Sequence, residues 1–169
     1  VNFSAAGYYF ARDLHAVLDV PVGMICTSWG GTNSEAWTSK ETISKFDPDI
    51  LFKSERPPHQ PAALFNGMIS PLLPYALKGA IWYQGESNRQ NPVAYGDLFP
   101  AMITDWRSHW GLGDFPFYFV QIAPYKYDGG VSSAIVRESQ MKTLDKVANT
   151  GMVVTMDIGN YDCIHPPKK

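Results

Sequence analysis

The order of apolar and polar positions along the chain predicts helices that alternate with short apolar strands. Over residues 3–18 the large apolar side chains recur at helical spacing, with charged residues off that stripe, which is typical of an amphipathic helix. The same spacing predicts a helix over residues 95–110 and another over residues 132–147. Residues 38–62 show no clean period, and we expect an irregular excursion there with one short helix.

Short apolar runs between these segments are predicted to be buried strands. They cover residues 21–28, 79–84, 115–122 and 151–158. Strands that are apolar throughout and alternate with helices indicate a parallel sheet covered on both faces, so we expect a three-layer α/β/α fold. In such a sheet the ligand site lies outside the carboxyl ends of the strands, which draws attention to the residues after Cys26, Tyr83 and Met156.

Composition and charge narrow the range of partners. The 169 residues are 45% hydrophobic, which is enough for the core of one domain, or most of one. With a net charge of −2, the chain lacks the excess of positive charge that would attract nucleic acid or an anionic membrane. No apolar run approaches the roughly 20 residues that span a bilayer. Cys26 and Cys163 lack metal-ligand spacing, and we expect neither a metal nor a cofactor. A neutral or small polar partner fits best.

Asp162 and His165 follow the last predicted strand and are candidates for a general base. Three residues apart in one loop, the carboxylate could hold the imidazole in one tautomer and stabilise its protonated form. An Asp and a His that are both simply solvated in a polar loop are an equally good interpretation.

A glycine turn, Trp29-Gly30-Gly31-Thr32, follows the first predicted strand. Gly30 and Gly31 would let a backbone N–H approach a ligand oxygen, as an oxyanion hole requires. A plain tight turn explains the same residues, and from the turn alone we favour it.

Gln84, Glu86 and Asn88 bring two amides and a carboxylate to the end of the second predicted strand. An amide N–H can stabilise an oxyanion, whereas Glu86 suits an orienting group or an acceptor for a sugar hydroxyl. Ordinary turn chemistry is the alternative, with Asn88 as a helix cap.

These loops would form an acyl-transfer site in which the nucleophile is missing. A nucleophile elbow has the pattern Gly-x-Ser-x-Gly. Ser28 fits this pattern only if cysteine is accepted at the first glycine position, and the segment around Ser87 lacks the second glycine.

Several blocks of the sequence resemble, in order, those of the sialate O-acetylesterases. They are Val22-Gly23-Met24-Ile25, Trp29-Gly30-Gly31-Thr32, Glu35-Ala36-Trp37, Leu64-Phe65-Asn66-Gly67-Met68-Ile69-Ser70-Pro71-Leu72, Ile81-Trp82-Tyr83-Gln84-Gly85-Glu86-Ser87-Asn88, Arg137-Glu138-Ser139-Gln140, Asp157-Ile158-Gly159 and Ile164-His165-Pro166. The resemblance covers nearly the whole chain, and the two longest blocks are highly specific when taken together.

The resemblance implies an α/β/α fold of the SGNH-hydrolase or flavodoxin-like type and hydrolysis of sugar acetyl esters without a metal. Carried over by motif, His165 is the general base and Asp162 its orienting carboxylate. A glycine of the Gly30-Gly31 turn supplies one oxyanion donor, and Gln84 is preferred to Asn88 as the amide donor.

The family's nucleophile lies in an early Gly-Gln-Ser-Asn-type block on the first strand, and residues 1–169 contain no such block. We therefore expect a partial SGNH-type catalytic domain, truncated at both ends, that lacks the first strand and the last helix. Ser28 and Ser87 are then local structure. Alone, the fragment is expected to be inactive and poorly folded, because the missing strand would be a central member of the sheet.

The main hypothesis is hydrolysis of O-acetyl esters on sugars, sialic acids foremost, through a serine acyl-enzyme in the intact protein. An acetylxylan-type or other carbohydrate esterase is one alternative, and a non-catalytic carbohydrate-binding or structural domain is the other. The expected partner is an acetylated carbohydrate, with no nucleic acid and no membrane, and the oligomeric state stays open. Related enzymes imply an extracytoplasmic location: secreted, periplasmic or lysosomal.

Overall fold

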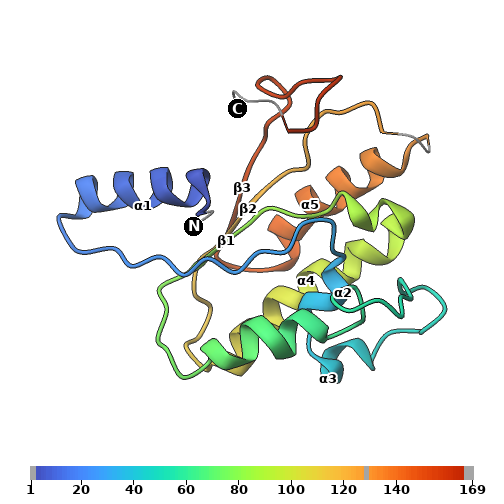
Figure 1. Cartoon of the computed structure of the whole chain (residues 1–169), viewed down its shortest axis with the longest axis horizontal. Helices are drawn as coiled ribbons and strands as arrows, with labels where there is room; N and C mark the ends of the chain where they lie inside the picture. Colours follow the sequence, from blue (N-terminus) through green and yellow to red (C-terminus); the bar gives the residue numbers. More distant parts are fainter. Residues whose placement is uncertain (1–2, 128–129, 166–169) are drawn as a thin grey trace. The chain divides into compact units, whose positions relative to one another are not determined.

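The computed structural model describes residues 3–127 and 130–165, and the chain divides into two compact units. The first unit ends at Gly30 and the second begins at Gly31. Figure 1 shows the helices and strands of both units.

The first unit contains one helix, α1 (Ala5–Leu18), which confirms the predicted amphipathic helix. Its amino end is capped by Ser4, whose hydroxyl oxygen accepts a hydrogen bond from the Gly7 N–H at 3.1 Å. Its carboxyl end is closed by Asp19, which adopts the left-handed conformation with φ 52°.

The predicted strand over residues 21–28 is wrong. The chain has no strand between Asp19 and Gly30, and Ile25, expected in a core, is 58% exposed. A strand exists only where a neighbour takes up its backbone hydrogen bonds, and among the described residues no segment forms a ladder with this run.

The second unit is built on a parallel three-stranded sheet in the order β1 (Ala80–Trp82), β2 (Phe117–Val120) and β3 (Thr150–Val153). These strands confirm three of the four predicted ones. β1 and β2 are shorter than the apolar runs that contain them, and β3 begins one residue before its predicted run and ends inside it. The predicted α/β class with a parallel sheet is confirmed.

Helical segments make up much of the rest of this unit. They are α2 (Ser34–Trp37), α3 (Lys40–Ile43), the π-helix η1 (Phe65–Ile69), the 3-10 helices η2 (Ser70–Leu72) and η3 (Ser87–Gln90), α4 (Pro92–Trp110) and α5 (Ser132–Lys146). The long helices α4 and α5 and the short helix α3 were predicted. The helix α2 lies outside the ranges in which a helix was predicted. Within the described ranges, no helix is both long and apolar enough to cross a membrane.

The core lies between one face of the sheet and the long helices. Trp82, Phe117 and Phe119 point into it, whereas the intervening Ile81 and Tyr118 are exposed. The α4 side chains meet these aromatic rings edge to face: the Phe99 and Phe119 centroids lie 5.0 Å apart, and those of Trp106 and Trp82 lie 5.6 Å apart.

Arg107 of α4 closes the amino-terminal edge of the sheet. Its buried guanidinium donates to the carbonyl oxygens of Phe115 at 2.7 Å, Ala148 at 2.9 Å and Asn149 at 3.1 Å. These contacts join the starts of β2 and β3, so the opposite, carboxyl edge carries the loops with the predicted site residues.

Candidate active site

The loops after β1, β2 and β3 leave the same edge of the sheet because the strands are parallel. The loop after β3 stays against the loop after β2: the Thr155 hydroxyl donates to the Gln121 carbonyl at 3.3 Å, and the Lys126 N–H donates to the Tyr161 carbonyl at 3.0 Å. Most of the predicted site residues lie on or beside these loops.

The glycine turn and the loop after β1 are joined directly. Gln84 donates through Nε2 to the carbonyl oxygen of Thr32 at 3.0 Å. Gly31, just before it, has φ +76°, a backbone conformation that glycine adopts without strain. This bond brings Thr32 and Gln84 together, as expected for the loops at residues 29–32 and 84–88, and the convergence of both with residues 162–165 stays a prediction. Gly30, the other glycine of the predicted turn, belongs to the first compact unit.

Asn88 is the centre of a buried hydrogen-bond network. Its Oδ1 accepts from the Ser34 N–H at 2.9 Å and from Gln84 Nε2 at 2.7 Å. Its Nδ2 donates to Glu35 Oε2 at 2.9 Å and to Asn91 Oδ1 at 3.2 Å. Asn88 is fully buried, so it holds together the segments around α2 and η3.

The predicted oxyanion donors have their amide hydrogens engaged in this arrangement. Gln84 uses both Nε2 hydrogens, on Thr32 and Asn88, and its Oε1 is buried with no hydrogen-bond partner among the described residues. Asn88 likewise donates both Nδ2 hydrogens. An oxyanion bound by either amide would have to replace one of these acceptors, and the donor roles stay predictions.

Gln140 of α5 clamps the ends of β1 and β2. Its Nε2 donates to the Gln84 carbonyl at 3.1 Å, and its Oε1 accepts from the Ile122 N–H at 3.0 Å. The side chain is fully buried and lies against Gly85, where no larger residue fits. The reasoning from residue types did not single out Gln140, although its block is part of the family resemblance.

Glu86 places a negative charge beside the predicted site residues. It lies half-buried at the start of η3, and its charge acts on nearby phenols. Burial, and after it the Glu86 charge, raise the pKa of Tyr83 to about 12. The same two causes raise the pKa of Tyr127, over whose ring the Arg89 guanidinium lies 4.2 Å from the centroid.

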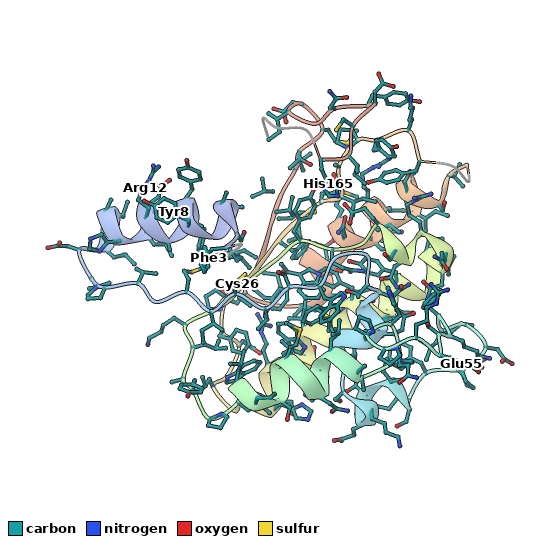
Figure 2. All side chains as sticks on the ribbon, in the orientation of Figure 1. Phe3, Tyr8, Arg12, Cys26, Glu55 and His165 are labelled. Carbon is teal, nitrogen blue, oxygen red and sulfur yellow. The ribbon has the colours of Figure 1, made fainter. Side chains whose placement is uncertain are left out.

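Asp162 and His165 lie in the loop after β3, and both are exposed. His165 is labelled in Figure 2. The Asp162 carboxylate accepts from Lys126 Nζ at 2.6 Å. Asn160 shapes this loop, because its Oδ1 accepts from the N–H groups of Asp162 and Cys163 at 2.8 and 3.0 Å. The predicted contact between Asp162 and His165 is not formed in this arrangement, and the base pair stays a prediction.

The candidate serines lie in different settings. Ser28 is an exposed residue of the first unit, and Ser87 begins η3, where its carbonyl oxygen accepts from Asn33 Nδ2 at 3.2 Å. In the part of the chain that the structure describes, no group of three or more His, Cys, Asp or Glu side chains could hold a metal ion.

Glu35 is the residue of this region that sequence reasoning missed as an individual. It is fully buried, and its carboxylate accepts from Asn88, from Asn91 and from the backbone of Phe52. Its signals were its place in the Glu35-Ala36-Trp37 block of the resemblance and the absence of any other charged residue between Asp19 and Lys40.

A parallel α/β sheet whose carboxyl edge carries a glycine turn, an amide network and an Asp-x-x-His loop has the layout of an SGNH-type ester hydrolase. A family model described as carbohydrate esterase, sialic acid-specific acetylesterase, matches residues 4–168, and the chain belongs to this family of carboxylic ester hydrolases.

Relatives of known name agree with this assignment. Over 98% of its length the chain is 35% identical to a sialate O-acetylesterase of Homo sapiens and 31% identical to one of Mus musculus. A crystal structure of a carbohydrate acetylesterase from Xanthomonas citri matches 97% of the chain with a TM-score of 0.87 and 40% identity. The chain covers 36% of the human protein, 40% of the mouse protein and 37% of the Xanthomonas chain.

Proposed function

We propose that the full-length protein hydrolyses O-acetyl esters on sugars, with sialic acids as the foremost substrates. The observation that carries the proposal is the direct hydrogen bond between Gln84 and Thr32, which unites two site loops of this acetylesterase-family chain at the carboxyl edge of its sheet.

The proposed mechanism is a serine acyl-enzyme. A serine outside these residues, in the family's Gly-Gln-Ser-Asn-type block, attacks the acetyl carbonyl while His165 takes its proton. His165 then returns that proton to the sugar oxygen as the C–O bond breaks. Water attacks the acetyl-serine, again losing its proton to His165, and acetate leaves as the serine is regenerated.

Asp162 orients His165 in this scheme. Its carboxylate has acceptor sites beyond the one that Lys126 uses, so it can accept from the His165 ring N–H after a rearrangement of an exposed loop. A backbone N–H of the Gly30-Gly31 turn supplies an oxyanion donor, and Glu86 accepts from a sugar hydroxyl.

Esters on other carbohydrates are a second candidate. The solved structure of a carbohydrate acetylesterase is 40% identical to this chain, whereas the human sialate O-acetylesterase is 35% identical. An acetylated carbohydrate is the partner in either case, and we propose an extracytoplasmic location for the protein.

The test measures acetate release by the full-length protein from O-acetylated sialic acid, acetylated xylan and an aryl acetate. We expect His165→Ala to reduce kcat/KM about 10³-fold or more, with a smaller loss for Asp162→Asn. His59→Ala, a histidine in the loop before η1, is the matched control and should keep full activity.

Near wild-type turnover by His165→Ala would refute the base assignment. Saturable binding of the acetylated sugar by a wild-type protein that releases no acetate would instead identify a carbohydrate-binding domain. The ratio of activities on sialic acid and xylan decides between the two substrate classes.

A further inference from the structure

Glu35 is a buried carboxylate held by neutral donors. Its side chain is fully buried in α2, where Oε1 accepts from the Phe52 N–H at 3.0 Å and from Asn91 Nδ2, and Oε2 accepts from Asn88 Nδ2 at 2.9 Å. Removing a charge from water is costly unless several hydrogen bonds compensate it, so its retention here needs a reason beyond packing.

The carboxylate determines which way Asn88 faces. An ionised carboxylate can only accept hydrogen bonds, so Asn88 must turn Nδ2 toward Glu35. Its Oδ1 is then forced to the other side, where Ser34 and Gln84 donate to it. The opposite orientation of the amide would place N–H groups against N–H groups on that side.

Asn88 in turn determines which way Gln84 faces. Because Asn88 Oδ1 and the Thr32 carbonyl are both acceptors, Gln84 must present Nε2 to them. The one group of Gln84 left without a partner among the described residues is then Oε1, a buried acceptor at the end of β1. The donor and acceptor sides of each hydrogen bond are therefore fixed in turn, from the Glu35 carboxylate through Asn88 to Gln84 and the glycine turn.

We propose that Glu35 is a positioning residue: its carboxylate fixes the orientations of Asn88 and Gln84 and the spacing of the two loops that carry the site. The inference rests on the proposed deacetylation, since it assigns to that reaction a residue that does not touch the substrate. Glu35, Asn88 and Gln84 form a hydrogen-bond relay, in which Glu35 acts through Asn88 and Gln84 is the last side chain.

Glu35→Gln in the full-length protein tests this relay. The new Nε2 group must face at least one of the donors that the carboxylate satisfied, so Asn88 and Gln84 lose their fixed orientation. Misplacing catalytic groups by about 1 Å can cost 10²-fold in rate, and we expect kcat to fall about 10- to 100-fold with KM changed less than about threefold. Glu41→Gln, the same chemical change at an exposed position of α3, is the matched control and should change neither.

The exchange Glu35→Gln with Asn88→Asp separates positioning from simple packing. In this double variant the new amide at position 35 donates to the new carboxylate at position 88, which reverses the direction of the native hydrogen bond. That carboxylate still accepts from the Ser34 N–H and from Gln84 Nε2, and the bond lost is the longer one that Asn88 Nδ2 donates to Asn91 Oδ1 at 3.2 Å. We expect the double variant to recover kcat to within a few fold of wild type. Asn88→Asp alone, which sets two carboxylates about 3 Å apart, should be strongly impaired.

Wild-type kcat in Glu35→Gln, or single-variant losses that simply add in the double variant, would overturn the relay. Melting temperatures of the same four proteins report the coupling of the two positions independently of catalysis. If wild type releases no acetate, the proposed function fails, and non-additive melting temperatures still support the relay while additive ones refute it.

Discussion

Gly85 lies where the loop after β1 passes over the core, and Gly85→Ala is the sharpest test of that packing. A Cβ at this position would come within 2.7 Å of Ile122 Cγ2 and within 3.2 Å of Val136 Cγ1 and Gln140 Nε2. All three neighbours are fully buried, so they have little room to yield. The backbone φ of +148° is also one that L side chains rarely adopt.

The expected cost combines two contributions. Inserting a methyl group into a filled core costs about 1–3 kcal/mol, and holding a non-glycine residue in a sparsely populated backbone region costs about 1–3 kcal/mol. The sum is about 2–6 kcal/mol, against a typical total stability of about 5–15 kcal/mol. At about 2–4 °C for each kcal/mol, the melting temperature should fall by roughly 10 °C.

The assay is thermal unfolding of the full-length protein followed by circular dichroism, with acetate release measured below the transition. Gly113→Ala is the matched control, because Gly113 also has a positive φ, +69°, but nothing lies within 4 Å of its Cβ position. The difference between the two variants reports the crowding at Gly85 together with the greater backbone strain at φ +148°. Equal melting temperatures for the two variants would refute the packing argument, and unchanged acetate release would show that Gln84 need not be held in place.

Two further predictions concern the edges of the sheet. Arg107→Lys keeps the charge but replaces the two separated guanidinium nitrogens by one ammonium nitrogen on a shorter side chain, which cannot match the positions of all three carbonyl oxygens. The variant should lose about 2–4 kcal/mol in denaturant unfolding, and an unchanged midpoint would contradict the role of the guanidinium. Tyr83, with its pKa raised to about 12 by burial and then by Glu86, holds its proton more tightly in the folded protein than in the unfolded chain, where the pKa is about 10. The stability that Tyr83 contributes is therefore complete below a pH of about 10 and is lost as the pH rises toward about 12. Over that range the melting temperature of Tyr83→Phe should decline less steeply than that of the wild type. Parallel declines of the two melting temperatures would rule the effect out.

The elements that the sequence predicted correctly are those with a local signal. The aromatic positions of α4 recur at helical spacing, and the apolar runs that cover β1, β2 and most of β3 are bounded by turn residues. The run at residues 21–28 carried the same signal and formed no strand. An apolar run shows that a segment suits a sheet, but pairing also needs a neighbouring strand, and composition does not report one.

The site shows the same division. Residue type drew attention to Gln84 and Asn88, because amides at a strand end can bind a ligand. Which of their hydrogens are engaged depends on Thr32 and Glu35, which lie 52 and 53 positions away along the chain. Asp162 suited a partner three residues ahead of it, yet its carboxylate accepts from Lys126, 36 positions away.

The sequence by itself therefore determined the α/β class, the places of the long helices and the edge of the sheet from which the loops with the predicted site residues leave. These follow from periodicity and from the rule that parallel strands end on one side, both of which are written locally along the chain. Only the tertiary structure decided that Glu35 is buried beneath the site, that Gln140 clamps two strands and that the amides of Gln84 and Asn88 face one way. The physical reason is that hydrogen-bond polarity and burial belong to pairs of groups, and folding brings those pairs together from distant parts of the chain.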